Sequence, residues 1–223
     1  MVGLIQNVGE SFKFGFGQCY HDGIKGFLRM LALFVLCFIP IAFFIPMGIF
    51  LKVFKGEKPD FTNAGQSFVR GLLFFVVALI YMIIPIILLA IFGGFAVIPA
   101  LFAGDIGAVF AVLIGGIGVI IALIVAVLFL IIAIPAEINY ARNGFAAAFK
   151  FTEIFGMIAK AGVAKYILSY IIYIIVMILI EVIYGLFLAC PSAGFVIGII
   201  LMILTVVPVS FFQYRYWANR FEA

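Results

Sequence analysis

Uncharged stretches alternate with short charged segments along the chain. Four stretches contain no charged residue, or a single one, and they are residues 30–51, 71–104, 106–136 and 166–214. A helix needs about 20 apolar residues to cross the hydrocarbon core of a bilayer. The second and third stretches therefore predict one crossing each, paired as a helical hairpin over residues 71–134. The last stretch is long enough for two crossings divided near Pro191, and it predicts a second hairpin over residues 166–214.

Two prolines interrupt the first stretch. Pro40 and Pro46 lie in the segment FIPIAFFIPMG, and a proline inside a helix removes a backbone donor and clashes with the preceding turn. We therefore expect residues 26–54 to form a broken hairpin that enters the membrane and returns to the same side. The alternative is one proline-kinked span.

Composition agrees with a membrane environment. Hydrophobic residues make up 68% of the 223 residues and charged residues only 10%, and the mean hydropathy is +1.42. A soluble domain of this size needs far more polar surface. The predicted fold is a single all-α, polytopic membrane domain. It has four full transmembrane helices, the proline-broken N-terminal hairpin and amphipathic interfacial helices.

Two segments outside the long stretches have amphipathic character. In residues 1–25, apolar positions recur at helical spacing opposite a polar set that includes Asn7, which predicts a helix lying in the membrane interface. The alternative is a frayed terminus. Residues 135–165 are Phe-rich and contain four basic residues. We expect them to form a cytoplasmic amphipathic segment between the two hairpins.

The positions of the basic residues predict how the chain is threaded. All thirteen Lys and Arg fall in four groups, at residues 13–29, 52–70, 142–165 and 215–220, and none lies near Asp105 or Pro191. Basic residues next to membrane helices stay on the cytoplasmic side. We therefore expect a multi-pass protein of the cell membrane with cytoplasmic N- and C-termini. The same face should attract anionic lipids. Nucleic acid is not an expected partner, because no domain outside the membrane presents these charges.

Three segments resemble a known family. They are GEKPDFTNAGQSFVRGLLFFVVALIYMIIPIILL, IPAEINYARNGFAAAFKFTEIFGMI and PVSFFQYRYWANRFEA. Together they resemble the integral membrane proteins grouped as domain of unknown function 4013, found mainly in archaea and some bacteria. PMGIFLKVFKGE departs from the family pattern, which has a Gly-Tyr pair before the basic residues. The resemblance implies a membrane topology and no mechanism, and it assigns no catalytic residue.

A polar stripe runs along the predicted helix after residue 165, and it ends near an isolated carboxylate, Glu181. Its members recur at spacings of 4, 3, 4, 4 and 3 and are Tyr166, Tyr170, Tyr173, Met177, Glu181 and Tyr184. At about 100° per residue they share one helix face. A charge in the membrane costs about 2.5–3.5 kcal/mol, so Glu181 should be protonated, hydrated or paired with another molecule. The stripe is a candidate intramembrane polar site, and its alternative role is to fill helix–helix seams.

Small residues form a second stripe in the stretch 106–136. They are Gly107, Ala111, Gly115, Gly118, Ala122 and Ala126. Small side chains on one face let another helix approach closely, so this stripe predicts helix packing. A pore-lining face is the alternative.

No residue pattern indicates an enzyme. Three cysteines cannot form a disulfide framework, and Cys19 with His21 would supply only half of a metal site. We expect no metal, no cofactor and no catalysis. The expected function is that of a non-catalytic membrane subunit, acting as an anchor, scaffold or assembly partner of another protein or of further copies. The alternative is a small transporter or channel with a proton or cation path along the tyrosines to Glu181.

Overall fold

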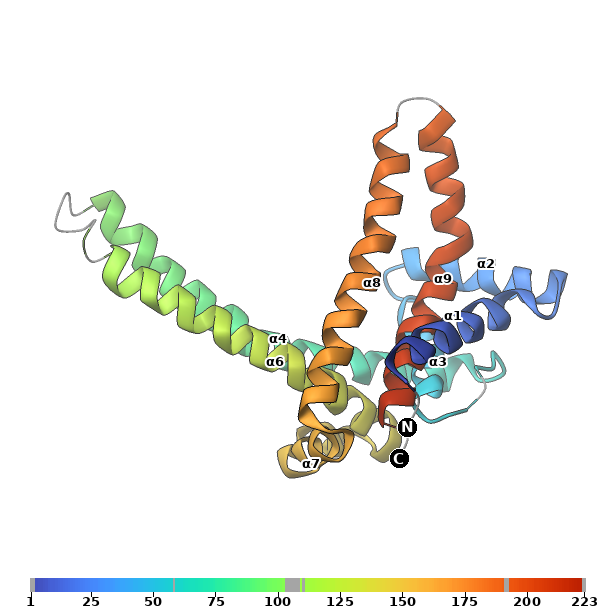
Figure 1. Ribbon diagram of the computed structural model, residues 1–223, viewed down its shortest axis with the longest axis horizontal. Coiled ribbons are helices and arrows are strands. Elements are labelled where there is room, and N and C mark those ends of the chain that lie inside the picture. The colour runs from blue at the N-terminus through green and yellow to red at the C-terminus, as the bar shows by residue number, and fades with distance from the viewer. Residues whose placement is uncertain (1–2, 58, 103–108, 110, 191–192, 222–223) are drawn as a thin grey trace.

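Helices account for the regular structure of the described chain (Figure 1). The computed structural model describes residues 3–57, 59–102, 109, 111–190 and 193–221. The helices are α1 (Leu4–Tyr20), α2 (Ile24–Phe38), α3 (Phe44–Phe54), α4 (Ala64–Phe102), the π-helical η1 (Ala111–Gly116), α6 (Ile117–Asn143), the 3-10 helix η2 (Phe145–Phe149), α7 (Phe151–Ala161), α8 (Val163–Ala189) and α9 (Ala193–Phe221). Within the described residues, four are long and apolar enough to cross a membrane: α4 over Ala64–Gly94, α6, α8 and α9. The predicted polytopic α-helical fold is confirmed.

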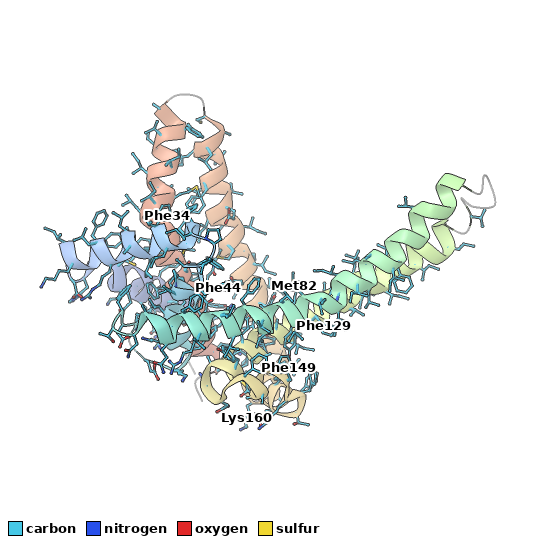
Figure 2. All side chains as sticks on the ribbon, turned by 180° about the vertical axis from the view of Figure 1, so that it is seen from behind. Phe34, Phe44, Met82, Phe129, Phe149 and Lys160 are labelled. Atoms are coloured by element: carbon cyan, nitrogen blue, oxygen red, sulfur yellow. The ribbon has the colours of Figure 1, made fainter. Side chains whose placement is uncertain are left out.

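The four long helices form two hairpins that diverge from a common base (Figure 1). One hairpin is α4 with α6, and the other is α8 with α9. The base contains α1, α3 and α7 together with the adjoining ends of the long helices. Away from the base the hairpins expose their apolar side chains (Figure 2). The most apolar window of α8 is only 6% buried within the chain, against 33% for α9, so most of the α8 surface is left to lipid or to another protein.

The first apolar stretch is divided into two short helices. α2 ends at Phe38, and Ile39 before Pro40 is extended, with φ −93° and ψ 113°. A proline disfavours helical geometry in the residue before it, which explains the break. Pro46 lies in the first turn of α3, where a missing N–H costs nothing because that turn has no intrahelical acceptor for it. α2 has 15 residues and α3 has 11, about 16–22 Å each at 1.5 Å per residue. That both flanks of this segment lie on one side of the membrane stays a prediction.

Two glycines bring α3 and α4 into backbone contact. A methyl group at Gly48 of α3 would overlap the carbonyl oxygen of Ser67 in α4. A methyl group at Gly71 of α4 would overlap the carbonyl oxygen of Phe44 in α3. Close approach of this kind requires residues without a side chain. The crossing therefore depends on glycine at both positions, and it holds α3 against the start of the first hairpin.

α1 docks on α9 through its small and polar face. Its buried residues are Asn7, Ser11, Gly15 and Cys19. The Asn7 amide donates to the Tyr216 carbonyl oxygen over 3.0 Å, and the Asn219 amide donates to Asn7 Oδ1 over 2.8 Å. Asn7 was expected on the outer, polar side of an interfacial helix, and that placement is wrong. The small side chains permit the close helix contact, whereas the apolar Ile5 remains 85% exposed.

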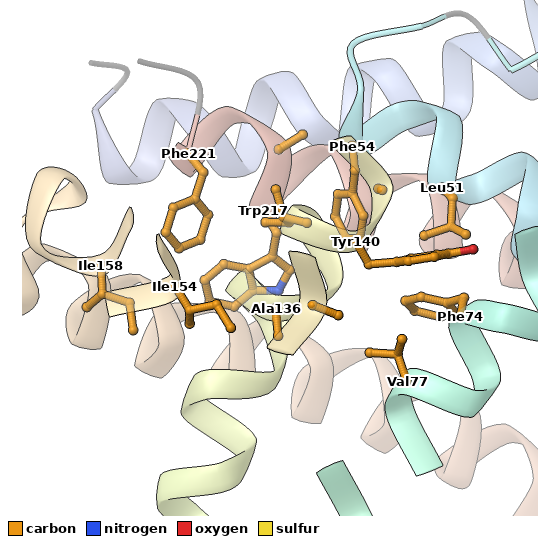
Figure 3. Close-up of a cluster of buried hydrophobic side chains, with 14 of the residues drawn as sticks. Leu51, Phe54, Phe74, Val77, Ala136, Tyr140, Ile154, Ile158, Trp217 and Phe221 are labelled. Carbon is orange, nitrogen blue, oxygen red and sulfur yellow. The ribbon is translucent and has the colours of Figure 1, made fainter. Parts of the chain in front are cut away.

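Aromatic and aliphatic side chains from seven elements form the core of the base, which we call the basal core (Figure 3). The residues labelled in Figure 3 are Leu51, Phe54, Phe74, Val77, Ala136, Tyr140, Ile154, Ile158, Trp217 and Phe221. Burial of such side chains is the main favourable term in holding packed helices together outside lipid. The basal core therefore fixes the ends of both hairpins relative to each other.

Candidate functional site

The tyrosines of α8 face the neighbouring helices. Tyr166 donates its hydroxyl proton to the Ile131 carbonyl oxygen of α6 over 2.6 Å, and the Tyr170 hydroxyl lies 3.4 Å from the Leu130 carbonyl oxygen. The Tyr173 ring stacks on Tyr216 of α9 at a centroid distance of 5.9 Å. Tyr184 Oη is 2.6 Å from Thr205 Oγ1 of α9. Four residues of the predicted stripe therefore lie in the seam of α8 with α6 and α9, and they are Tyr166, Tyr170, Tyr173 and Tyr184.

Two tyrosine hydroxyls, one from α8 and one from α1, bind carbonyl groups that a proline has released. Pro135 lies inside α6 and has no N–H to donate to Ile131, four residues earlier. The hydroxyl of Tyr166 from α8 takes that place. Pro208 inside α9 likewise leaves the Leu204 carbonyl without an intrahelical donor, and the hydroxyl of Tyr20 at the end of α1 donates to it. Pro135 and Pro208 are therefore each matched by a tyrosine from another helix.

Glu181 interacts electrostatically with Tyr184 but makes no hydrogen bond to these tyrosines among the described residues. It is exposed on α8, at the edge of a shallow apolar groove whose other lining residues are Tyr173, Ile174, Met177, Ile178 and Val182. In the part of the chain that the structure describes, no basic side chain lies within ion-pair distance of it. Between Tyr173 and Glu181 the stripe contains only Met177, whose sulfur accepts a hydrogen bond from Gln213 over 3.4 Å. The stripe is thus not a continuous line of hydroxyl groups.

A different carboxyl group lies among the tyrosines. Glu137 of α6 is partly buried, and it interacts electrostatically with the hydroxyls of Tyr166, Tyr170, Tyr173 and Tyr214. Glu137 was not among the predicted site residues, because it stands at the end of an apolar stretch and was assigned to the segment 135–165. In the structure α6 continues to Asn143, so Glu137 lies within the helix. The sequence feature that could have identified Glu137 is its position two residues after Pro135, at the end of an apolar stretch.

The small-residue stripe faces α4. Gly115, Gly118 and Ala122 are buried, and a methyl group at Gly118 would overlap the ring of Phe92 in α4. Ala126 is partly buried. Gly107 lies outside the described residues, and Ala111 belongs to η1. These residues place the closest part of the α4–α6 contact along one side of α6.

A cavity of about 430 Å³ lies between the end of α6, α7 and the end of α9, and we call it the α7 cavity. Its walls include Arg142, Lys160 and Arg220 and the carboxylate of Glu153. Hydrogen bonds from Asn139 and Lys150 hold the pKa of the Glu153 carboxyl below its ordinary value of 4.5. The guanidinium groups of Arg142 and Arg220 are tied to backbone carbonyls at about 3.0 Å.

A second cavity of about 270 Å³ lies between α3, α4 and the end of α6, and we call it the α3–α4 cavity. Its lining residues are Leu51, Lys52, Lys55, Arg70, Leu73, Tyr140, Ala141, Gly144 and Phe145. They include three basic side chains and no acidic one. The described residues contain no group of three or more His, Cys, Asp or Glu side chains arranged to hold a metal ion.

These features define the protein as a multi-pass helical membrane protein with a tightly packed base. Residues 31–189, more than two thirds of the chain, match the family model described as "Protein of unknown function (DUF4013)". The chain belongs to this family, as its sequence motifs predicted. No curated protein and no solved structure matches it.

Proposed function

We propose that the protein is a non-catalytic membrane subunit that assembles with another membrane-spanning helix along the exposed face of α8. The observation that carries this proposal is Glu181, a carboxyl group on an exposed apolar helix face with no basic partner among the described residues. Polar groups in lipid act as attachment points between helices. The fitting partner is a transmembrane helix with a hydrogen-bond donor or a basic side chain opposite Glu181, from another protein or from a second copy.

The orientation proposed from the basic residues is compatible with this role. The thirteen Lys and Arg positions favour a cytoplasmic base, cytoplasmic termini and a location in the cell membrane. Glu181 then lies in the outer half of the bilayer. Anionic lipids of the inner leaflet would be neighbours of the base, and they cannot reach the α8 groove.

Site-specific photocrosslinking in native membranes tests the α8 face. A photoreactive residue at Ile178, beside Glu181 in the groove, should give one protein adduct of defined mass. Glu181→Leu should reduce that adduct at least about tenfold, which corresponds to about 1.4 kcal/mol, because it removes the only carboxyl group among the residues that line the groove. The thermal stability of the isolated chain should not fall, since Glu181 makes no hydrogen bond or ion pair within the described residues.

A matched control uses the other hairpin. A photoreactive residue at Ile124, which is 57% exposed on α6, should give lipid adducts only and should not respond to Glu181→Leu. Lipid adducts alone at Ile178, or a protein adduct that persists unchanged in Glu181→Leu, would rule out assembly through this face.

A small transporter or channel is the second candidate, and Glu137 is the observation that favours it. A carboxyl group that interacts electrostatically with four tyrosines can exchange a proton or coordinate a cation within the membrane protein. Glu137→Gln keeps the shape and removes the charge. If the protein transports, proton or cation flux into vesicles should fall at least about tenfold in Glu137→Gln and persist in Glu181→Gln. Equal flux in the wild type, both variants and protein-free vesicles would eliminate this function.

A further inference from the structure

The α3–α4 cavity concentrates positive charge from two helices. Lys52 and Lys55 come from α3, and Arg70 comes from α4. The glycine-mediated crossing of these helices, at Gly48 and Gly71, brings the three side chains to one place and fixes their relative positions. Like charges held together repel each other unless a counter-ion is present. The packing of the base thus creates a fixed cluster of cations around a cavity.

Only one of the three cations is neutralised within the described chain. Lys52 is 6% exposed and forms an ion pair with Asp60, to whose backbone oxygen it also donates over 3.2 Å. The hydrogen bond from Lys52 holds the pKa of the Asp60 carboxyl below its ordinary value of 3.8, so Asp60 is ionised at neutral pH. Lys55 and Arg70 are not paired with a carboxylate among the described residues. The cavity therefore has an excess of two positive charges.

The remaining walls suit a small, strongly charged ligand with an apolar neighbour. Tyr140 supplies a hydroxyl whose own proton is donated to the Arg70 carbonyl oxygen over 2.7 Å, which fixes the backbone of Arg70. Leu51 and Leu73 give the cavity an apolar side, and Phe145 at its edge is 38% exposed. An arginine and a lysine at a fixed separation are the side chains that proteins use to hold phosphate groups.

The α7 cavity fits such a ligand less well. Glu153 lines it and repels anions, and Arg142 Nε and Arg220 Nη2 already donate to carbonyl oxygens of the protein, which leaves Arg220 Nε as the unpartnered buried donor among the described residues. The absence of an acidic lining residue distinguishes the α3–α4 cavity from it.

We propose that the α3–α4 cavity binds a phosphate-bearing anion, from either a lipid headgroup or a soluble phosphate, through the side chains of Lys55 and Arg70. This proposal concerns a different surface from the α8 face and does not depend on assembly with another helix. A lipid phosphate would enter with its acyl chains toward the exposed apolar surface of α4, whereas a soluble phosphate would enter from water.

The test compares two double variants that remove the same charge. Lys55→Gln with Arg70→Gln alters the cavity, and Lys25→Gln with Lys165→Gln removes two cations from exposed positions outside both cavities. The purified protein in uncharged detergent is titrated, at constant ionic strength, with inorganic phosphate and separately with short-chain phosphatidylglycerol. Binding is measured by calorimetry and by the upward shift of the unfolding temperature that a bound ligand causes.

The expected result is saturable binding of at least one of the two probes to the wild type and to the Lys25/Lys165 variant. The Lys55/Arg70 variant should bind that probe at least about tenfold more weakly. Binding of phosphatidylglycerol alone identifies a lipid headgroup as the ligand, and binding of inorganic phosphate identifies a site open to water. Equal weakening in both double variants would show non-specific attraction and overturn the proposal, as would absence of saturable binding of either probe to the wild type.

Unfolding of the ligand-free variants shows whether the substitutions damage the fold. Lys55 and Arg70 make no side-chain hydrogen bond that holds the base together among the described residues. The unfolding temperature of the ligand-free Lys55/Arg70 variant should therefore match that of the wild type. The single variant Lys55→Gln, at an exposed position, provides the same comparison with a smaller change. It should still weaken binding of the probe relative to Lys165→Gln, and equal binding by these two variants would also overturn the proposal.

Discussion

Gly48→Ala is expected to destabilise the protein more than a Gly→Ala substitution at any other described glycine that lies in a helix contact. The new methyl group would overlap the Ser67 carbonyl oxygen, which is a backbone atom of α4 and cannot move as a side chain can. Over-packing against backbone costs about 3 kcal/mol or more. The measurement is thermal unfolding in detergent, where we expect a fall of about 6–12 °C at about 2–4 °C per kcal/mol, or failure to purify as a monodisperse species.

Gly9→Ala is the matched control for this experiment. Gly9 lies in the middle of α1, and a methyl group there meets nothing within 4 Å. Alanine is favoured over glycine inside a helix by about 0.5–1 kcal/mol, so Gly9→Ala should unfold at the same temperature as the wild type or a higher one. If Gly48→Ala were as stable as Gly9→Ala, the close crossing of α3 and α4 would be wrong.

Replacing Tyr166 with phenylalanine should produce the second largest effect. The ring and its packing are kept, and only the donor to the Ile131 carbonyl oxygen is lost. That carbonyl has no intrahelical donor, because residue 135 is a proline, and it would remain unsatisfied in the buried base. The expected loss is about 1–3 kcal/mol in the free energy of unfolding. It is measured by thermal or denaturant unfolding in detergent.

A double-mutant cycle separates this explanation from general loss of a hydroxyl group. Pro135→Ala restores an N–H that can donate to Ile131 within α6. In the Pro135→Ala background, Tyr166→Phe should lower the free energy of unfolding by less than half of the amount that it does in the wild-type chain. Tyr170→Phe serves as the control in both backgrounds, because its hydroxyl lies 3.4 Å from the Leu130 carbonyl and should have a small, equal effect in each. The same cost for Tyr166→Phe with and without Pro135 would contradict the proline–tyrosine pairing.

The membrane helices were predictable because they depend on local sequence. An uncharged run of sufficient length identifies a crossing whatever lies next to it, and the break at Pro40 follows from the geometry of one dipeptide. The end of α6 was not predictable in this way. The predicted hairpin ended at residue 134, whereas the helix continues to Asn143, and a tyrosine from α8 satisfies the carbonyl that Pro135 releases. The end of α6 depends on a contact between helices, and the periodicity of residues within one helix contains no information about such a contact.

The candidate site shows the same division between local and non-local information. The shared face of Tyr166, Tyr170 and Tyr173 follows from helical spacing, and the structure places those residues in one seam. Which carboxyl group lies beside them depends on the helix across the seam. Glu137 of α6 occupies that place, and Glu181 faces outward. Asn7 illustrates the opposite error, since a polar side chain was assigned to water although α9 offered it two hydrogen-bond partners.

The docking of α1 on α9 has a consequence for the time at which the fold is completed. Asn7 and the residue it donates to are separated by 209 positions, so a ribosome must deliver both hairpins before this contact can form. During that interval Asn7 lacks both of its hydrogen-bond partners on α9. A face of asparagine, serine and glycine can wait in contact with water or lipid headgroups, whereas a face of leucine would be drawn into the bilayer or into premature association. The polarity of the α1 face thus leaves α1 free to dock on α9 once α9 has been synthesised.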